Sequence, residues 1–177
     1  MMECAVERQD LSTEEQSWYA IYTIVRHEKS VNSALIEKNV DTYLPIKKVV
    51  NRWKDRKKEV HIPLFPGYLF VNSSLENRLK ILNTRGVIRI VGVNGFPTSV
   101  SNKQIETIKS ILDTNLICDP YPYLSEGKEV IVIRGPLEGA IGRIIGRRGE
   151  YKLILSVDLI KRSVSVEVDI DDVERNY

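Results

Sequence analysis

The sequence predicts an α+β protein: an N-terminal ferredoxin-like α/β sandwich followed by a small SH3-like all-β barrel. Three observations indicate this fold class. Strand-like and helix-like segments alternate between residues 18 and 112, a proline-rich segment without periodicity follows, and the rest contains short strands separated by glycine turns. With 177 residues, 42% of them hydrophobic and 28% charged, the chain is long enough for two small globular domains.

The first predicted elements are a strand and a helix. Residues 1–17 show no periodicity and are expected to form a flexible acidic tail. A strand is predicted by WYAIYTI, which begins at Trp18, and the following segment places Val31, Ala34 and Leu35 at helical spacing. Further strands are predicted by TYLPIKKVV, EVHIPLF and GYLFV, and the charged turn NRWKDRKK separates the first two.

Two more helices flank the strand VIRIVGV. The first has a predicted capping box of Ser73 and Glu76 and ends at Gly86. The second begins at Ser101, with Gln104 three residues later. The apolar faces of the two helices are predicted to consist of Leu75, Leu79 and Leu82, and of Ile105, Ile108 and Leu112. Together with the strands, these helices complete the sandwich of residues 18–112.

A domain boundary is predicted at residues 113–124, which contain DPYPY and are expected to form a stiff, extended connector. Beyond it, strands are predicted from EVIVI, AIGRIIG, YKLILSV and VSVEVDI. Without a helical repeat, residues 125–177 are expected to form a five-stranded barrel.

The charge is divided unevenly along the chain. The net charge of +2 conceals an excess of acids in the tail and a large excess of lysine and arginine within residues 18–112, whereas residues 125–177 are nearly neutral. The basic half is therefore the better candidate to face nucleic acid. No apolar run approaches the roughly 20 residues of a membrane-spanning helix, and the N-terminus is unlike a signal peptide, so a cytoplasmic protein without membrane contact is expected.

No motif indicates an enzyme. The sequence lacks a glycine-rich phosphate loop, an HExxH motif and a nucleophile elbow, so no catalytic residue is assigned. Cys4 and Cys118 lie far apart and are expected to be free thiols. The acids of DIDDVE lack the loop glycine and terminal glutamate of a calcium site, so no metal or other cofactor is expected.

The segment VIVIRGPLEGAIGRIIG resembles the KOW motif of ribosomal and transcription-elongation proteins. Its motif positions are Gly135, Pro136, Gly139 and Gly142, where glycine permits a tight corner between strands. The segments WYAIYTIVRHEKSV, LFPGYLFV and NTRGVIRIVGVNGFPTSVSNKQIETI are similar, in order and spacing, to the N-terminal NGN domain of NusG-type transcription factors. The resemblance covers residues 18–177.

The resemblance implies a monomeric factor that binds RNA polymerase through its NGN domain and recruits another partner through its KOW domain. In this family an aromatic patch packs on the clamp helices of the polymerase's largest subunit, so that the enzyme pauses less. The positions that match this patch are Tyr22, Phe65, Pro66, Tyr68 and Phe70, joined by Trp18 or Tyr19. Trp18 and Tyr19 alternate in direction along the first strand, so one of the two is expected to pack inside. Alternation along the strand places Tyr68 and Phe70 on one face of the sheet, opposite Leu69 and Val71. From composition alone, the same rings would more often fill a core.

Basic residues form the second candidate site. The charged turn NRWKDRKK is expected to project from the sheet as a basic tip. Such a tip would contact phosphates or stack a base on Trp53. A solvated hairpin explains the composition of the turn equally well. Thr84 and Arg85 lie in a stretch that is similar to factors of the RfaH type. In those factors, the matching Thr-Arg pair contacts the non-template DNA strand. The candidate nucleic-acid residues are Arg26, His27, Lys29, Arg52, Trp53, Lys54, Arg56, Lys57, Lys58, Thr84, Arg85 and Arg89.

Overall likeness is closer to operon-specific antiterminators of the RfaH type than to general NusG, which remains the alternative. In the general factor an aromatic residue of the KOW domain helps to contact termination factor Rho or ribosomal protein S10, and Ile160 stands at the matching turn, DLIKRS. Loss of an interface ring weakens binding, so recruitment of Rho is expected to suffer. A ribosome-associated RNA-binding KOW protein is a further alternative, but the near-neutral charge of residues 125–177 disfavours it.

Overall fold

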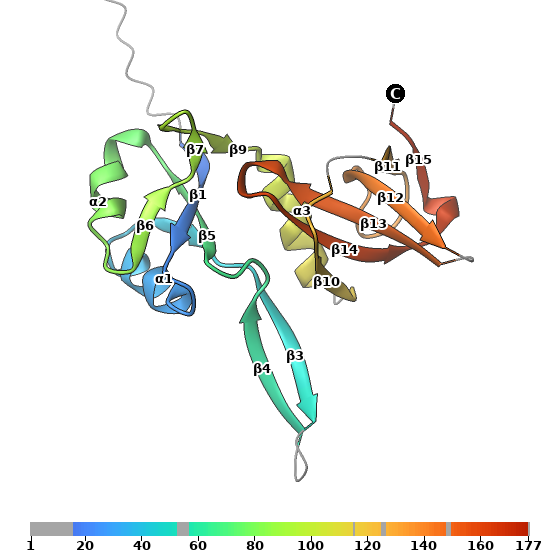
Figure 1. The fold of residues 1–177 in the computed structure, drawn as a ribbon, viewed down its shortest axis with the longest axis horizontal. Helices are drawn as coiled ribbons and strands as arrows, with labels where there is room; N and C mark the ends of the chain where they lie inside the picture. The colour runs from blue at the N-terminus through green and yellow to red at the C-terminus, as the bar shows by residue number, and fades with distance from the viewer. Residues whose placement is uncertain (1–15, 53–56, 115, 125–126, 148–149, 177) are drawn as a thin grey trace, which may run out of the picture.

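The computed structural model of the chain describes residues 16–52, 57–114, 116–124, 127–147 and 150–176. An N-terminal α+β module and a C-terminal all-β module lie on either side of helix α3 (Asn102–Asp113), as Figure 1 shows. The predicted fold class is therefore confirmed. The expected acidic tail, apart from its last two residues, lies outside the described residues.

The N-terminal sheet is antiparallel and has the order β2-β5-β1-β6, with β9 also pairing with β1. Its strands are β1 (Ser17–Thr23), β2 (Asp41–Tyr43), β5 (Tyr68–Ser73), β6 (Val87–Ile90) and β9 (Ser99–Val100). Alternate residues of β1 and β5 enter different hydrophobic clusters. Leu69 packs with Val31 and Leu35 of helix α1 (Glu28–Glu37), whereas Phe70 faces the opposite side of the sheet. The predicted alternation along β5 is confirmed.

The helix predicted after β5 is present but shorter than expected. A 3-10 turn, η1 (Leu75–Asn77), leads into the short helix α2 (Arg78–Leu82). The expected capping box is wrong, because Ser73 ends β5 and the turn's N-cap, Ser74, makes no side-chain capping bond. Only Ile81 of α2 is buried. The leucines expected to face the core are exposed instead, namely Leu75, Leu79 and Leu82.

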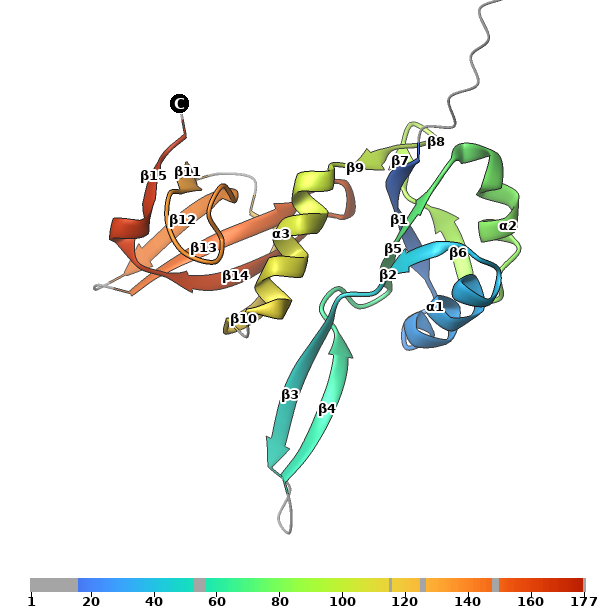
Figure 2. The same ribbon diagram turned by 180° about the vertical axis from the view of Figure 1, so that it is seen from behind.

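Helix α3 begins as predicted. The Ser101 side chain accepts a hydrogen bond from the Gln104 backbone N–H at 3.3 Å. Ile105, Ile108 and Ile111 are buried, and Leu112 is partly buried against the same cluster. Seen from behind in Figure 2, the helix lies between the N-terminal sheet and the strands of the C-terminal module. No helix in the described part of the chain is long and apolar enough to cross a membrane.

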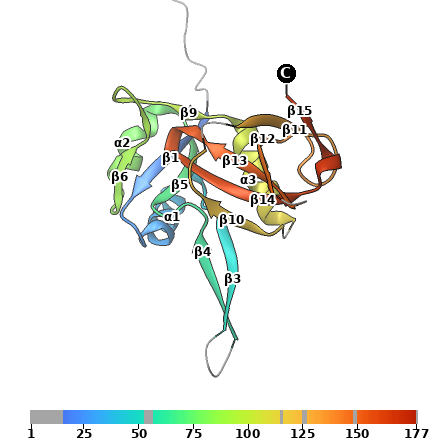
Figure 3. The same cartoon turned by 45° about the vertical axis from the view of Figure 1, so that its right-hand side comes forward.

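The strands β3 (Ile46–Arg52) and β4 (Lys57–Pro63) form a separate two-stranded ribbon, paired from Ile46 with Pro63 to Arg52 with Lys57. Figure 3 shows that this ribbon extends away from both modules. A smaller hairpin consists of β7 (Gly92–Val93) and β8 (Phe96–Pro97).

The C-terminal sheet has the order β10-β14-β13-β12-β11-β15. Its strands are β10 (Cys118–Tyr121), β11 (Lys128–Val132), β12 (Ile141–Arg147), β13 (Glu150–Val157), β14 (Arg162–Val168) and β15 (Val173–Arg175), with 3-10 turns η2 (Asp158–Ile160) and η3 (Ile170–Asp172). The segment expected to be only a connector contributes β10 to this sheet. Pro120 is tolerated because β10 is an edge strand.

Candidate functional site

The structure does not bring the predicted aromatic residues together in one open patch. They lie on both faces of the N-terminal sheet, and only some of them reach the protein surface. Tyr19 packs on the face of α1, so it cannot share a surface with Tyr22 and Tyr68. Trp18, Phe65 and Phe70 lie on the opposite face but are buried, with Phe65 2% and Phe70 0% exposed. These four rings are core residues in this arrangement and not parts of an open patch.

Helix α3 explains the burial of this face. The Lys109 ammonium lies 5.3 Å from the centroid of the Trp18 ring and 5.6 Å from that of the Tyr43 ring. Tyr43 also stacks on Phe70, with ring centroids 6.4 Å apart. Burial raises the pKa of the Tyr43 hydroxyl far above its ordinary value, and the charge of Asp113 adds to the effect.

A smaller aromatic surface remains at the end of the sheet. Tyr22 and Tyr68 are paired across β1 and β5, both are partly exposed, and their ring centroids are 5.1 Å apart. Pro66 beside them is exposed, and the Arg89 guanidinium lies 5.8 Å from the Tyr22 centroid. We call these four residues the tyrosine surface. It offers rigid rings beside a positive charge, a combination suited to contact with another macromolecule.

Backbone bonds fix the turn that carries Pro66. The Tyr68 N–H donates to the Phe65 carbonyl at 3.0 Å, and the Thr23 N–H donates to the Gly67 carbonyl at 2.8 Å. The turn is thus joined to the end of β1. It holds Pro66 and Tyr68 in a defined position next to Tyr22.

The predicted basic residues of the N-terminal module are placed differently from one another. Arg26, His27 and Arg85 are exposed at the same end of the sheet as the Gly67 turn. Thr84 is buried: its hydroxyl accepts a bond from the Lys38 ammonium at 2.7 Å and donates to a backbone carbonyl. Thr84 is therefore not available as a surface contact. Its hydroxyl is instead bonded to the backbone of α2. The Lys29 ammonium is also engaged, on the carbonyl of residue 61 in β4 at 2.8 Å.

Three of the remaining candidates lie on the strands of the ribbon. The backbones of Arg52, Lys57 and Lys58 lie on β3 and β4, toward the outer end. Trp53, Lys54 and Arg56 lie outside the described residues.

In the C-terminal module, the segment that resembles the KOW motif forms the corner between β11 and β12. Gly135 and Gly139 have φ values of +86° and +80°, which favour glycine, and Pro136 is exposed between them. Gly142 has a different reason to be glycine, since an added Cβ would lie 2.7 Å from the Ile154 carbonyl oxygen. Ile160 is 4% exposed and packs in the core, so its expected role as a surface contact is not supported.

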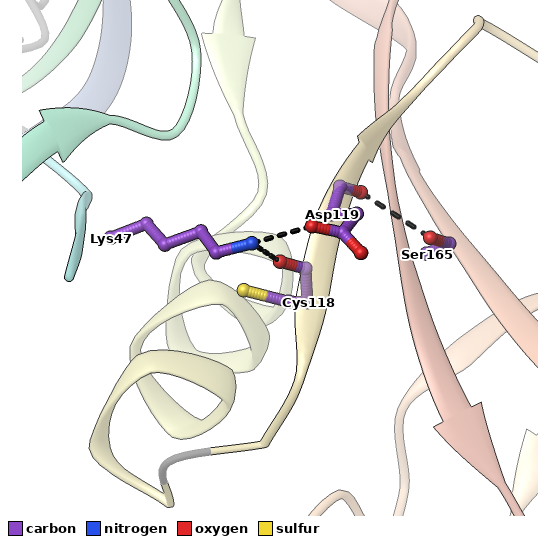
Figure 4. Close-up of polar contacts among 4 residues, drawn as sticks. All are labelled: Lys47, Cys118, Asp119 and Ser165. Atoms are coloured by element: carbon purple, nitrogen blue, oxygen red, sulfur yellow. Dashed lines mark hydrogen bonds and ion pairs between the residues drawn. The ribbon is translucent and has the colours of Figure 1, made fainter. Parts of the chain in front are cut away.

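One contact between the modules was not predicted from the sequence. The Lys47 ammonium, at the base of the ribbon, lies 2.5 Å from an Asp119 carboxylate oxygen and also contacts the Cys118 carbonyl, as Figure 4 shows. The Asp119 carbonyl accepts a bond from the Ser165 hydroxyl of β14 at 3.4 Å. The ribbon is thereby joined to the C-terminal sheet. Burial raises the pKa of the Cys118 thiol, and the charge of Lys47 opposes this effect.

Comparisons with known proteins place this geometry in a family. The family model described as "Transcription termination factor nusG" matches residues 16–109, more than half of the chain. "Transcription termination/antitermination protein NusG" from Helicobacter pylori is 27% identical over 89% of this chain and 97% of its own length. The protein of the same name from Thermus thermophilus is 27% identical over 88% of this chain and 96% of its own length.

A solved structure supports the fold. The structure described as "Domain interaction in Thermotoga maritima NusG" has a TM-score of 0.55 and 23% sequence identity, covering 92% of this chain and 98% of that one. Members of the matched family are transcription factors and not enzymes. The chain belongs to the NusG family.

Proposed function

We propose that the protein is a transcription elongation and antitermination factor that binds RNA polymerase through residues 18–112 and recruits a second partner through residues 125–177. Its family and the names of its relatives support a role in transcription. The observation that carries the polymerase contact is the partly exposed Tyr22 and Tyr68 pair beside Pro66. Rigid aromatic side chains bury a large area on binding and lose little rotamer entropy.

The proposed polymerase contact is the pair of clamp helices of the largest subunit. The tyrosine surface supplies the anchor, and Arg89 supplies a positive charge at its edge. The buried face under α3 is proposed to contribute only by fixing the positions of these side chains. Arg26, His27 and Arg85, together with the ribbon, are proposed to contact the exposed non-template DNA strand through its phosphates.

The relatives carry the general NusG name, which supports a general factor over the operon-specific antiterminator expected from the sequence. Mapping of nascent transcripts in a deletion strain distinguishes them: a general factor changes pausing on most transcription units, and a specialised one on a few long operons. Rho or ribosomal protein S10 is the proposed partner of the C-terminal module. Its contact surface must involve residues other than the buried Ile160.

Replacement of both surface tyrosines tests the polymerase contact. Loss of two interface anchors is expected to weaken binding of the Tyr22→Ala/Tyr68→Ala variant to purified core RNA polymerase by about 30-fold or more. Binding is measured by fluorescence titration, after circular dichroism has shown that the variant is folded.

The matched control is Phe96→Ala. Phe96 is 76% exposed in the β7–β8 hairpin of the same module, so its replacement removes an exposed ring from a different place. The control is expected to bind as the wild type does. Equal affinity of the double tyrosine variant and the wild type would exclude the tyrosine surface as the anchor.

A further inference from the structure

The side chain of Glu28 is buried at the start of α1, although a carboxylate is costly to remove from water. The residue is 3% exposed, and its Oε1 accepts a hydrogen bond from the Gly67 N–H at 2.7 Å. Among the residues that the structure describes, none forms an ion pair with this carboxylate. The Glu28 side chain, at the start of α1, is thus hydrogen-bonded to the turn that carries Pro66.

Gly67 depends on this support. Its φ is +83°, and an added Cβ would lie 3.3 Å from the Tyr22 ring, so the chain passes close to the tyrosine surface at this residue. Its carbonyl is bonded to Thr23, and its N–H is bonded to Glu28. Both polar groups of this buried residue are thereby satisfied from β1 and α1. Without the carboxylate, the N–H would be left unpaired unless the turn moved toward water.

We infer that Glu28 is a positioning residue of the polymerase-binding surface, holding the Phe65–Tyr68 turn so that Pro66 and Tyr68 stand beside Tyr22. This inference rests on the proposed function. Glu28 does not touch the partner, because it is buried. It acts through the Gly67 backbone, and its effect on binding is an effect on the geometry of the turn.

A simpler role for Glu28 is electrostatic stabilisation of α1, since acidic residues are favoured in the first turn of a helix. The two roles require different properties of the side chain. Stabilisation of the helix requires a negative charge near its N-terminus. Positioning of the turn requires an oxygen at the reach of a glutamate side chain.

Two conservative substitutions separate these roles. Glu28→Gln keeps the acceptor oxygen at the same reach and loses the charge, whereas Glu28→Asp keeps the charge and is one methylene shorter. For a positioning residue, we expect Glu28→Gln to bind core RNA polymerase within about threefold of the wild type and Glu28→Asp to bind about tenfold more weakly. The reverse order would overturn the inference, as would wild-type affinity in both variants.

The same variants are examined by hydrogen exchange of the Gly67 amide in the full-length protein. Protection is expected to survive in Glu28→Gln and to fall in Glu28→Asp. Leu35→Ala, on the buried face of the same helix, is the control for general destabilisation. It is expected to lower the melting temperature without weakening binding by the folded protein. A loss of affinity equal to that of Glu28→Asp would reduce Glu28 to a stabilising residue.

The amide measurement also separates this inference from the proposed function. If the wild-type protein fails to bind polymerase, the proposed function is wrong, and Gly67 protection still shows whether Glu28 holds the turn. If the wild type binds and Gly67 is equally protected in all the variants, the positioning role fails while the proposed function stands.

Discussion

Tyr68 and Phe70 stand two residues apart on the same face of β5, yet only Tyr68 reaches the surface. Phe70 lies between Phe65 and Tyr43, with ring centroids 6.2 Å and 6.4 Å away, beneath α3. Tyr68 begins the strand and has Tyr22 as its aromatic neighbour. Position along the strand therefore decides which ring can contact a partner.

The turn before Tyr68 contains Gly67, whose backbone has a positive φ. Gly67→Ala is expected to reduce the free energy of unfolding by about 2–3 kcal/mol, because it adds crowding against Tyr22 to the strain of a positive φ. Chemical denaturation measures the change. Gly95→Ala is the control: its φ of +84° imposes similar strain, and nothing lies within 4 Å of the added Cβ. Equal costs for the two substitutions would show that the contact with Tyr22 adds nothing.

At the scale of elements, the ribbon of β3 and β4 is attached at its base and extends from it. Lys29 of α1 binds the β4 backbone, and Lys47 of β3 binds Asp119 on β10. Its outer end carries a cluster of basic residues in the sequence. A ribbon fixed at one end can reach a partner at a distance from the modules.

The basic end of the ribbon is expected to contribute to single-stranded DNA binding through phosphate contacts. For Arg56→Ala/Lys57→Ala, the slope of the logarithm of affinity against the logarithm of salt concentration should decrease by roughly 1.4, about 0.7 for each lost contact. Fluorescence anisotropy with a labelled oligonucleotide measures the slope. The control, Lys128→Ala/Lys152→Ala, removes the same charge from the C-terminal module. An equal change in both variants would contradict a specific role of the ribbon.

At the scale of the whole molecule, one hydrophobic cluster continues from the N-terminal sheet through α3 into the C-terminal module. The Gln104 side chain of α3 donates to the Ser156 carbonyl of β13 at 3.3 Å. A cavity of about 310 Å³ remains between α3 and the strands β12 to β14. The two modules are therefore held by packing together with a small number of polar bonds, of which the Lys47 contact is one.

Loss of the Lys47 contact is expected to loosen the arrangement and to expose Cys118. In a Cys4→Ser background, Lys47→Ala should increase the rate of Cys118 labelling by a thiol reagent several-fold. The direction of the change in labelling rate distinguishes the two outcomes. Lys47 lowers the pKa of the Cys118 thiol, so loss of Lys47 without separation of the modules would raise that pKa and slow labelling. Lys48→Ala, the neighbouring exposed lysine, is the control. A slower or unchanged rate in Lys47→Ala would mean that packing alone holds the modules.

Much of the fold could be predicted because it depends on local patterns. The alternation in β1 and β5, the cap at Ser101 and the glycine corner at Gly135 follow from short-range chemistry. The prediction that the leucines of η1 and α2 face the core was wrong. Helical spacing does not show which side of a helix has a neighbour to pack against. Ile81, which the pattern did not select, fills the core instead.

Local sequence patterns were sufficient to predict that a mixed α and β module precedes an all-β module, and which strand residues share a face. Contacts between distant segments establish instead which aromatic rings are accessible, that Thr84 and Ile160 are internal, and that Glu28 reaches Gly67. The difference arises because periodicity records a side chain's direction relative to its own backbone. Burial and hydrogen bonding depend on which distant segment lies there, and here those segments are α3, the C-terminal sheet and the turn at Gly67.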